Sequence, residues 1–223
     1  MVSMGTHFFI SATGTDLGKT WLTAGVAAAC RARGVAVRSL KPVMSGYDVE
    51  RHEDSDAARL DVGGTLAIDS ITPWRFNAPL SPDLAAAQEG RKIDFAELVG
   101  WCRKQDEANP GLLLVEGIGG VMVPLDARHT VRDWIAALAI PSVLVCGSYL
   151  GSLSHTLTAL AALREVGVVP VLIVVNESAC SAVSLAETME SLAPHLAGVP
   201  LVTLRRDNTE DLATLADHLL RQP

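Results

Sequence analysis

The feature that most constrains the fold is a glycine-containing loop between an apolar, strand-like run and a helix-like run near the N-terminus. Residues 8–11 read FFIS, and a short loop ending at Gly18 leads into Lys19 and Thr20. Gly-Lys-Thr at a helix start is typical of loops that bind nucleotide phosphates. Thr13 stands where the common G-x-x-x-x-G-K-[ST] spacing has its first glycine, so a plain turn that starts a helix stays an alternative. The strand–loop–helix context favours the nucleotide site, with an exposed Lys19 side chain.

Short β-branched runs alternate along the chain with longer segments of helical period. This alternation is typical of βαβ units and predicts a parallel sheet with helices on both faces. No linker or low-complexity tract interrupts it, so we expect one α/β domain over residues 1–223. Substrate-specific loops are expected in the Pro- and Gly-rich segment 42–93. The expected strands are 8–11, 35–40, 112–116, 142–146 and 171–175, and the expected helices are 20–33, 94–108, 131–138, 152–166, 181–196 and 209–221.

The charge balance indicates small-molecule ligands. The chain carries 18 basic and 25 acidic residues, a net charge of −7, so we expect neither a nucleic-acid nor a membrane partner. No apolar stretch reaches the ~18 residues of a membrane span, and the N-terminus lacks the pattern of a secretory leader, so we expect a cytoplasmic protein. The four cysteines form no C-x-x-C pair, and we expect them reduced and mostly buried.

A phosphate site of this kind needs oxygen ligands for Mg²⁺. The Thr20 hydroxyl is one candidate, and Glu116 is a second, because it ends the apolar run LLLVE where a buried strand would meet the ligand edge of the sheet. Asp56 is a third candidate. The alternatives are a strand-end acid before a glycine turn for Glu116 and a helix N-cap for Asp56.

Lys41 precedes Pro42, which biases it toward extended geometry and lets its side chain project from the end of the second expected strand. A solvated surface lysine is the alternative. A lysine at this edge of the sheet would add positive charge to a site that binds anionic phosphates.

Several motifs together resemble the dethiobiotin synthetases, the enzymes that close the ureido ring in biotin synthesis. The resemblance covers nearly the whole chain and implies a P-loop NTPase-like, three-layer α/β/α fold. It also implies ATP- and Mg²⁺-dependent carboxylation and ring closure of 7,8-diaminopelargonate with CO₂, through a carbamate, to give dethiobiotin, ADP and phosphate. The motifs are TGTDLGKT at 13–20, KPVMSG at 41–46, DSDAARL at 54–60, FNAPLSP at 76–82, VEGIGGVMVPL at 115–125, LGSLSH at 150–155 and VVN at 174–176.

The resemblance also implies roles for individual residues, and it implies a homodimer with the diamine bound at the subunit interface. Thr15, Lys19 and Lys41 are the expected catalytic residues, and Thr20, Asp56 and Glu116 would hold Mg²⁺. The expected nucleotide-binding residues are Asp16, Leu17, Gly18, Lys19, Thr20, Asp56, Glu116, Gly117, Ile118, Gly119, Asn176, Glu177, Pro200, Leu201 and Val202. The expected substrate-binding residues are Thr15, Lys41, Ser45, Gly151, Ser154 and Thr188, of which Ser154 and Thr188 replace the asparagine and tyrosine of other members.

Two other functions are compatible with a phosphate loop. One is a switch ATPase of the partition or septum-placing type, which usually carries a second lysine early in the loop. Residues 12–14 read Ala-Thr-Gly and offer none. The other is a regulatory relative that retains ATP binding without the diamine reaction.

Overall fold

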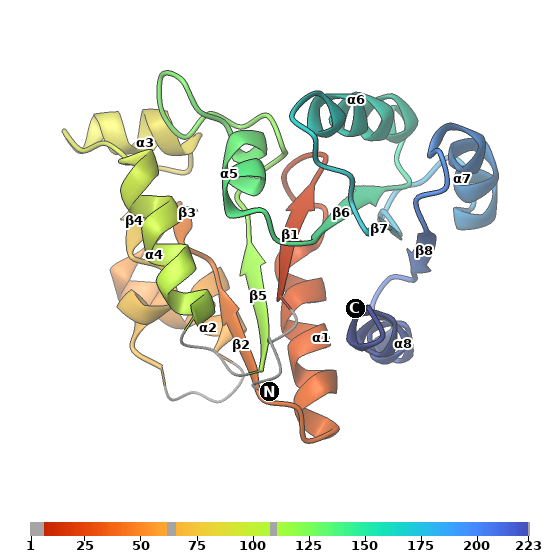
Figure 1. Cartoon of the computed structure of the whole chain (residues 1–223), viewed down its shortest axis with the longest axis horizontal. Coiled ribbons are helices and arrows are strands. Elements are labelled where there is room, and N and C mark those ends of the chain that lie inside the picture. Colours follow the sequence, from red (N-terminus) through yellow and green to blue (C-terminus); the bar gives the residue numbers. More distant parts are fainter. Residues whose placement is uncertain (1–6, 62–65, 108–110, 223) are drawn as a thin grey trace.

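The computed structural model describes residues 7–61, 66–107 and 111–222, with a six-stranded parallel sheet at the centre (Figure 1). The strand order is β2-β5-β1-β6-β7-β8, and a separate two-stranded parallel pair joins β3 and β4. The strands are β1 (His7–Ala12), β2 (Val37–Leu40), β3 (Val43–Ser45), β4 (Trp74–Phe76), β5 (Leu112–Glu116), β6 (Ser142–Gly147), β7 (Leu172–Asn176) and β8 (Leu201–Leu204).

Helices cover both faces of this sheet, as the alternating sequence pattern predicts. They are α1 (Lys19–Ala32), α2 (Asp56–Leu60), α3 (Pro82–Gln88), α4 (Phe95–Glu107), α5 (Val131–Leu138), α6 (Ser152–Glu165), α7 (Leu185–Leu192) and α8 (Thr209–Leu220). Short 3-10 turns span Val49–Asp54, Ile68–Ser70 and Ala193–His195.

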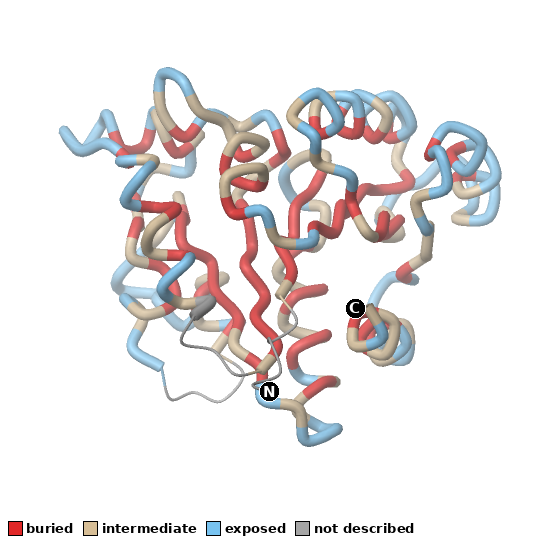
Figure 2. The backbone as a smooth tube through the Cα atoms, in the orientation of Figure 1, coloured by how far each residue is buried: buried red, intermediate tan, exposed pale blue. Residues whose placement is uncertain are grey.

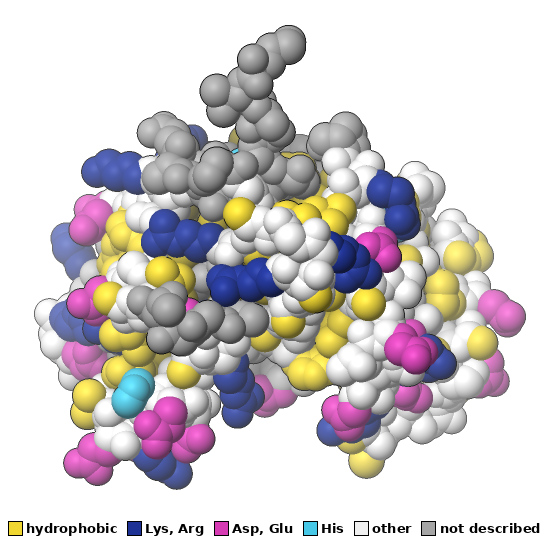
Figure 3. Space-filling model, turned by 90° about the horizontal axis from the view of Figure 1, so that it is seen from below, with side chains coloured by type: hydrophobic (Ala, Val, Ile, Leu, Met, Phe, Trp, Pro, Cys, Tyr) yellow, Lys and Arg dark blue, Asp and Glu magenta, His cyan; other side chains and the backbone are white. Residues whose placement is uncertain are grey.

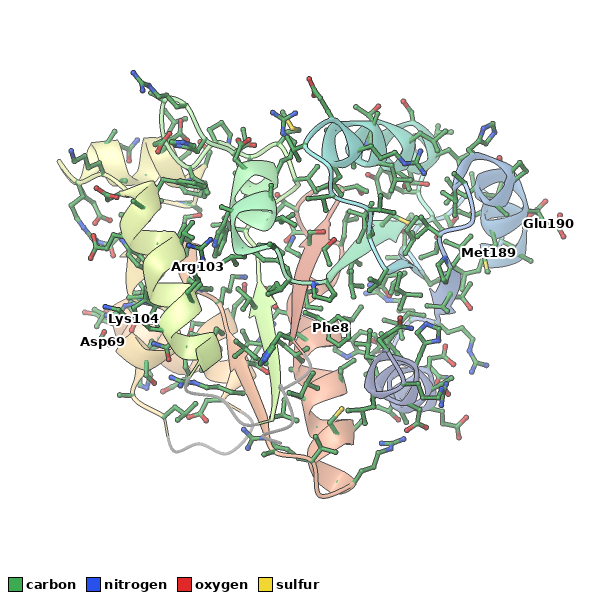
Figure 4. The ribbon with its side chains drawn as sticks, in the orientation of Figure 1. Phe8, Asp69, Arg103, Lys104, Met189 and Glu190 are labelled. Carbon is green, nitrogen blue, oxygen red and sulfur yellow. The ribbon has the colours of Figure 1, made fainter. Side chains whose placement is uncertain are left out.

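The strands are apolar throughout because each of their faces packs against a separate core. Phe8 belongs to the core with α1 and α8, whereas its neighbour Phe9 belongs to the core with α4, α5 and α6. Phe8 lies in the interior beside β1 (Figure 4), and the strands are the most continuously buried part of the backbone (Figure 2). The resulting α/β/α layering confirms the expected fold class.

The structure contains elements that the sequence pattern did not predict. All five predicted strands are present, with ends shifted by at most two residues. Three strands, β3, β4 and β8, and two helices, α2 and α3, were not predicted. The predicted helix 181–196 begins only at Leu185, because Ser184 caps it: the Ser184 hydroxyl accepts from the Glu187 N–H and the Glu187 carboxylate accepts from the Ser184 N–H. Residue 108, the predicted end of another helix, lies outside the described residues.

The strands run in one direction, so their carboxyl ends gather at one edge of the sheet, where open α/β sheets bind ligands. The opposite edge, viewed in Figure 3, presents basic and acidic side chains among hydrophobic ones. Within the described ranges, the helices are too short or too polar to cross a membrane.

Candidate active site

The phosphate loop connects the carboxyl end of β1 to the first turn of α1. Asp16 and Gly18 have left-handed backbones, with φ of 57° and 81°. A side chain at Gly18 would also place a Cβ 2.2 Å from Nδ2 of Asn176, so glycine is required for two reasons. No side chain caps α1 and its first turn holds no acidic residue. Its N-terminal N–H groups are therefore available to an anion.

Lys19 is buried, and two loops hold its ammonium group. Nζ donates to the carbonyl oxygen of Gly14 at 3.1 Å and to that of Gly119 at 2.8 Å. Burial lowers the pKa of Lys19 to about 8, although Glu116 opposes the shift. The expectation of an exposed Lys19 is wrong, because these carbonyl groups hold the side chain against the loop that follows β5.

That loop packs closely on the phosphate loop because it is rich in glycine. A Cβ at Gly120 would lie 2.9 Å from the carbonyl oxygen of Thr13, so a larger residue would separate the two loops. The N–H of Val121 donates to the carbonyl oxygen of Ala12. Gly120 thus serves the packing of one loop on the other.

A cluster of one cation, two carboxylates and one hydroxyl lies beside Lys19. Oε1 of Glu116 accepts from the Thr20 hydroxyl at 2.7 Å and from Nζ of Lys41 at 2.8 Å. Lys41 also forms an ion pair with Asp56, the first residue of α2. These side chains come from α1, β5, α2 and the end of β2, so four segments that are distant in sequence meet here.

Burial and charge both shape this cluster. Glu116 has no exposed surface and Lys41 is 6% exposed. Burial disfavours the Lys41 ammonium, but Glu116 and Asp56 outweigh it and raise the pKa of Lys41. Burial likewise opposes ionisation of Asp56, yet Lys41 holds the pKa of that carboxyl below its ordinary value. The cluster therefore consists of charged groups that depend on one another.

The oxygens of this cluster suit a small divalent cation. Thr20, Asp56 and Glu116 supply one hydroxyl and two carboxylates, and Oε2 of Glu116 is buried without a hydrogen-bond partner. A buried orphan oxygen of this kind is costly unless a ligand satisfies it. Elsewhere in the described chain, no group of three or more His, Cys, Asp or Glu residues could hold a metal.

Several predicted residues line one cavity of about 420 Å³ in front of the cluster. Ser45, at the end of β3, and Thr15, in the phosphate loop, face it from different sides. The other predicted residues that line it are Asp16, Leu17, Gly18, Lys19, Thr20, Lys41, Asp56, Ile118 and Gly119. The structure thus brings the predicted phosphate, metal and catalytic residues together.

A second cavity of about 570 Å³ adjoins the other side of the phosphate loop. Asn176, the last residue of β7, and Glu177, which follows it, line this cavity together with Asp16. Nδ2 of Asn176 donates to the carbonyl oxygen of Leu17 at 2.9 Å, so a residue expected to bind the nucleotide also holds the phosphate loop.

Pro200, Leu201 and Val202 lie away from these cavities. Leu201 and Val202 begin β8 and pair with Ile173 and Val174, and Pro200 directly precedes them. Both cavities lie instead at the carboxyl ends of the strands. These residues were expected to bind the nucleotide, but they line neither cavity, because β8 was not predicted and its carboxyl end comes later. From this part of the chain, Arg206 and Asp207 line the second cavity.

Three of the residues expected to bind substrate, Gly151, Ser154 and Thr188, are not gathered with the rest. Gly151 caps α6 and Ser154 is exposed in its first turn, and neither lines the cavity of Lys41. Thr188 is 2% exposed, and its hydroxyl donates to the carbonyl oxygen of Ser184. The expected role for Thr188 is wrong, because the side chain faces the interior side of α7.

Sequence reasoning missed other residues that line the cavities. Trp21 borders both of them, and Arg59 borders the first. Each had a sequence signal, since Trp21 follows Thr20 directly and Arg59 lies one helical turn after Asp56. Ser178 lines the second cavity and exchanges hydrogen bonds with Ser148, which joins the loops after β6 and β7.

Comparisons with known proteins identify the family of this chain. A family model described as an AAA domain matches residues 6–206. The ATP-dependent dethiobiotin synthetase BioD of Acidiphilium cryptum (strain JF-5) is 48% identical over 200 residues, which cover 87% of this chain and 90% of that protein. The chain belongs to the dethiobiotin synthetase family. The enzyme of the same name from Caulobacter sp. (strain K31) is 45% identical, with 95% of this chain and 93% of that protein covered.

Solved structures of other proteins share the fold of this chain. The MinD cell division protein of Aquifex aeolicus superimposes with a TM-score of 0.62 at 11% identity, covering 98% of each chain. A ParA family ATPase from Chlorobium tepidum TLS gives a TM-score of 0.57 at 13% identity, covering 97% of this chain and 92% of that one. At such identities the likeness concerns the fold alone.

Proposed function

We propose that this chain is an ATP-dependent dethiobiotin synthetase and works as a single domain over residues 1–223. The observation that carries the proposal is the buried cluster of Lys41, Glu116, Asp56 and Thr20 beside a phosphate loop, in a member of this family. The reaction joins 7,8-diaminopelargonate, CO₂ and ATP to give dethiobiotin, ADP and phosphate.

The reaction needs ATP because a carbamate is a poor electrophile. One amine of the diamine carries CO₂ as an anionic carbamate. A carbamate oxygen attacks the γ-phosphorus and the bond to the bridging oxygen of ADP breaks, which leaves a carbamic–phosphoric anhydride. The second amine then attacks the carbonyl carbon, phosphate leaves, and that amine loses a proton as the ring closes. Holding this amine close contributes several kcal/mol through effective molarity.

Positive charge is the main contribution of the protein, since the carbamate and the phosphoryl group are both anionic. Lys19 would contact the terminal phosphates, and Lys41 would stabilise the carbamate and the phosphoryl group during transfer. Thr15 and Ser45 line the same cavity and would position the diamine. A covalent nucleophile is not required.

Thr20, Asp56 and Glu116 would hold Mg²⁺ in this proposal. The two carboxylates and the hydroxyl fit a hard cation that keeps water and phosphate ligands, and Oε2 of Glu116 has no other hydrogen-bond partner. When bound, the ion neutralises charge on the phosphates and helps to align them.

The nucleotide base would occupy the second cavity, beside Asn176 and Glu177. Asn176 uses one N–H to hold Leu17, which leaves its other N–H and its carbonyl oxygen for the base. Arg206 and Asp207 replace Pro200, Leu201 and Val202 in this proposal, because they line that cavity.

We propose that the active form is a homodimer. Met122, Leu150 and Leu153 are 47%, 90% and 36% exposed, and Met122 borders a cavity of about 680 Å³ that also reaches Thr15. Exposed apolar side chains beside a site are typical of a surface that another protein covers, here a second copy of the chain. Leu150→Asp should therefore give monomers in light scattering after size exclusion, whereas Leu84→Asp, a change at an exposed leucine of α3, should leave dimers. A dimeric Leu150→Asp would place the interface elsewhere.

The experiment that tests the function is ADP release with the diamine and bicarbonate, together with mass-spectrometric detection of dethiobiotin. We expect ADP and dethiobiotin in equal amounts, and release that depends on the diamine. Diamine-independent hydrolysis would favour a switch ATPase instead. Nucleotide binding without turnover would favour the regulatory relative.

A further inference from the structure

Three cations line the cavity of about 420 Å³, and the protein holds only two of them in place. Lys19 donates to two carbonyl groups, and Lys41 is paired with Glu116 and Asp56. The third is Arg59, an exposed residue on α2. Within the described part of the chain, its guanidinium has no hydrogen-bond or ion-pair partner.

The position of Arg59 follows from the helix that carries it. Ser55 caps α2, and its hydroxyl accepts from the Ala58 N–H, which fixes the helix start. Asp56 begins the helix, and Arg59 follows three residues later on the same side. The helix therefore brings a candidate metal ligand and a guanidinium to one wall of the cavity. Arg51, on the preceding turn, does not line the cavity and instead pairs with Asp48.

We propose that Arg59 is a catalytic residue that contacts the γ-phosphoryl group of ATP. The inference rests on the proposed function. Arg59 borders the cavity of Lys41 and Ser45 and not the second cavity beside Asn176, so it lies at the phosphate end of the nucleotide and not at the base. A guanidinium can donate two parallel hydrogen bonds to phosphoryl oxygens and remains charged at every working pH.

The step that Arg59 would assist is the transfer itself. The bond between the γ-phosphorus and the bridging oxygen breaks, its electron pair stays on ADP, and a carbamate oxygen forms the new bond to phosphorus. Arg59 donates hydrogen bonds and transfers no proton. Because its guanidinium is not held by other groups, Arg59 can donate to the phosphoryl oxygens that carry the charge during transfer.

The test compares Arg59→Gln and Arg59→Lys with Arg51→Gln, a matched change at an arginine outside the cavity. Calorimetry with Mg²⁺ would measure the affinity for ADP and for the β,γ-imido analogue of ATP, without diamine. For Arg59→Gln we expect an unchanged ADP affinity and an analogue affinity roughly tenfold weaker. We also expect kcat to fall roughly 10²–10³-fold, the scale found when one donor to the transition state is removed. Arg59→Lys should recover part of both losses, and Arg51→Gln should behave as wild type.

Other outcomes would overturn the assignment. Equal losses of ADP and analogue affinity would place Arg59 on the α- or β-phosphate. A raised KM for the diamine or bicarbonate, with both nucleotide affinities unchanged, would place it on the carbamate. Turnover and affinities within threefold of wild type would make it a solvated surface residue. Because the affinity difference is read without diamine, it tests Arg59 even if dethiobiotin synthesis itself fails.

Discussion

Nζ of Lys41 lies 2.8 Å from Oε1 of Glu116, and neither side chain has more than a few per cent of its surface exposed. Lys41 thus supplies the positive charge that a fully buried carboxylate requires. The same carboxylate, with Asp56 and Thr20, forms the oxygen set proposed for Mg²⁺. Lysine and metal ion therefore compete for one group of oxygens.

The first prediction concerns Lys41→Gln. We expect ATP binding to persist while kcat falls roughly 10²–10³-fold, because the lost charge acts mainly on the transition state. Removing one partner of a buried pair should also cost about 3–5 kcal/mol of folding stability. Mg²⁺ without nucleotide should then raise the melting temperature of this variant more than that of wild type, since no ammonium competes.

Lys92→Gln, a change at an exposed lysine, is the control for these measurements. Thermal unfolding with and without Mg²⁺, and steady-state ADP release, are measured for both variants. A Lys41→Gln enzyme that turns over within threefold of wild type would remove Lys41 from the mechanism. Equal responses to Mg²⁺ would show that Lys41 and the ion do not share ligands.

The second prediction concerns Glu116→Gln. The amide keeps an acceptor for the Thr20 hydroxyl but removes a full negative charge from the oxygen set. We expect the Mg²⁺ concentration for half-maximal ADP release to rise roughly tenfold or more, within the 10–100-fold losses seen when metal sites are perturbed. Glu97→Gln, on the exposed side of α4, should leave the titration unchanged. A wild-type titration for Glu116→Gln would place the metal elsewhere.

The third prediction concerns pH and Lys19. Burial lowers its pKa to about 8, so the free protein loses this positive charge above pH 8. Bound phosphates favour the ammonium, hence ADP binding at pH 8.5 should take up protons, and affinity should fall as pH rises. Calorimetry in two buffers of different ionisation enthalpy measures the uptake. Lys19→Ala should bind ADP weakly, with the proton uptake absent. Pronounced uptake in that variant would assign it to another group.

The stability effect of Lys19 has the opposite sign. Its pKa is lower in the folded chain than the ordinary lysine value of 10.5, so the unfolded chain binds more protons between about pH 8 and 10.5. The free energy of unfolding contributed by this group therefore rises with pH across that range.

The fourth prediction concerns the cysteines. Cys180 is exposed, whereas Cys30, Cys102 and Cys146 are buried. Burial raises the pKa of Cys102 to about 12 and that of Cys146 to about 11, so almost no thiolate forms there at pH 8. Ellman's reagent should therefore titrate one thiol in the native protein, none in native Cys180→Ser, and four in denatured wild type. Rapid reaction of two or more native thiols would contradict the buried placement.

The raised thiol pKa values also make the free energy of unfolding depend on pH. Unfolded thiols, with an ordinary pKa of 9.0, ionise before the folded ones as pH rises. Their contribution to the free energy of unfolding therefore falls above about pH 9. This change opposes the effect of Lys19 in the same range.

The sequence predicted the strands that form the buried centre of the sheet, because residues buried on both faces read as continuous apolar runs. It missed β8, an edge strand whose first three residues are only half-buried. That omission produced the wrong placement of Pro200, Leu201 and Val202. It also missed β3, β4, α2 and α3, because three-residue strands and short helices show little periodicity.

The candidate site was predictable where each residue ended a strand or began a helix, as for Lys19, Thr20, Lys41 and Glu116. Parallel strands bring such positions to one edge whatever their separation in sequence. Thr188 could not be placed in this way, because its direction depends on how α7 is turned against the core. The burial of Lys19 depends on carbonyl groups of two separate loops, which no local pattern reveals. The cytoplasmic location of the protein stays a prediction.

The central place of β1 determines when the site can form during synthesis. β1 leaves the ribosome first, yet both of its partners come much later, since β5 begins at Leu112 and β6 at Ser142. Pairing across such separations is slow, because long loops must close before any stabilising contact forms. A nascent chain would thus carry the apolar run of β1 without partners until β5 and then β6 have been made. Truncations that end before β6 should accordingly bind holdase chaperones and lack nucleotide affinity, although the complete phosphate loop is present in them.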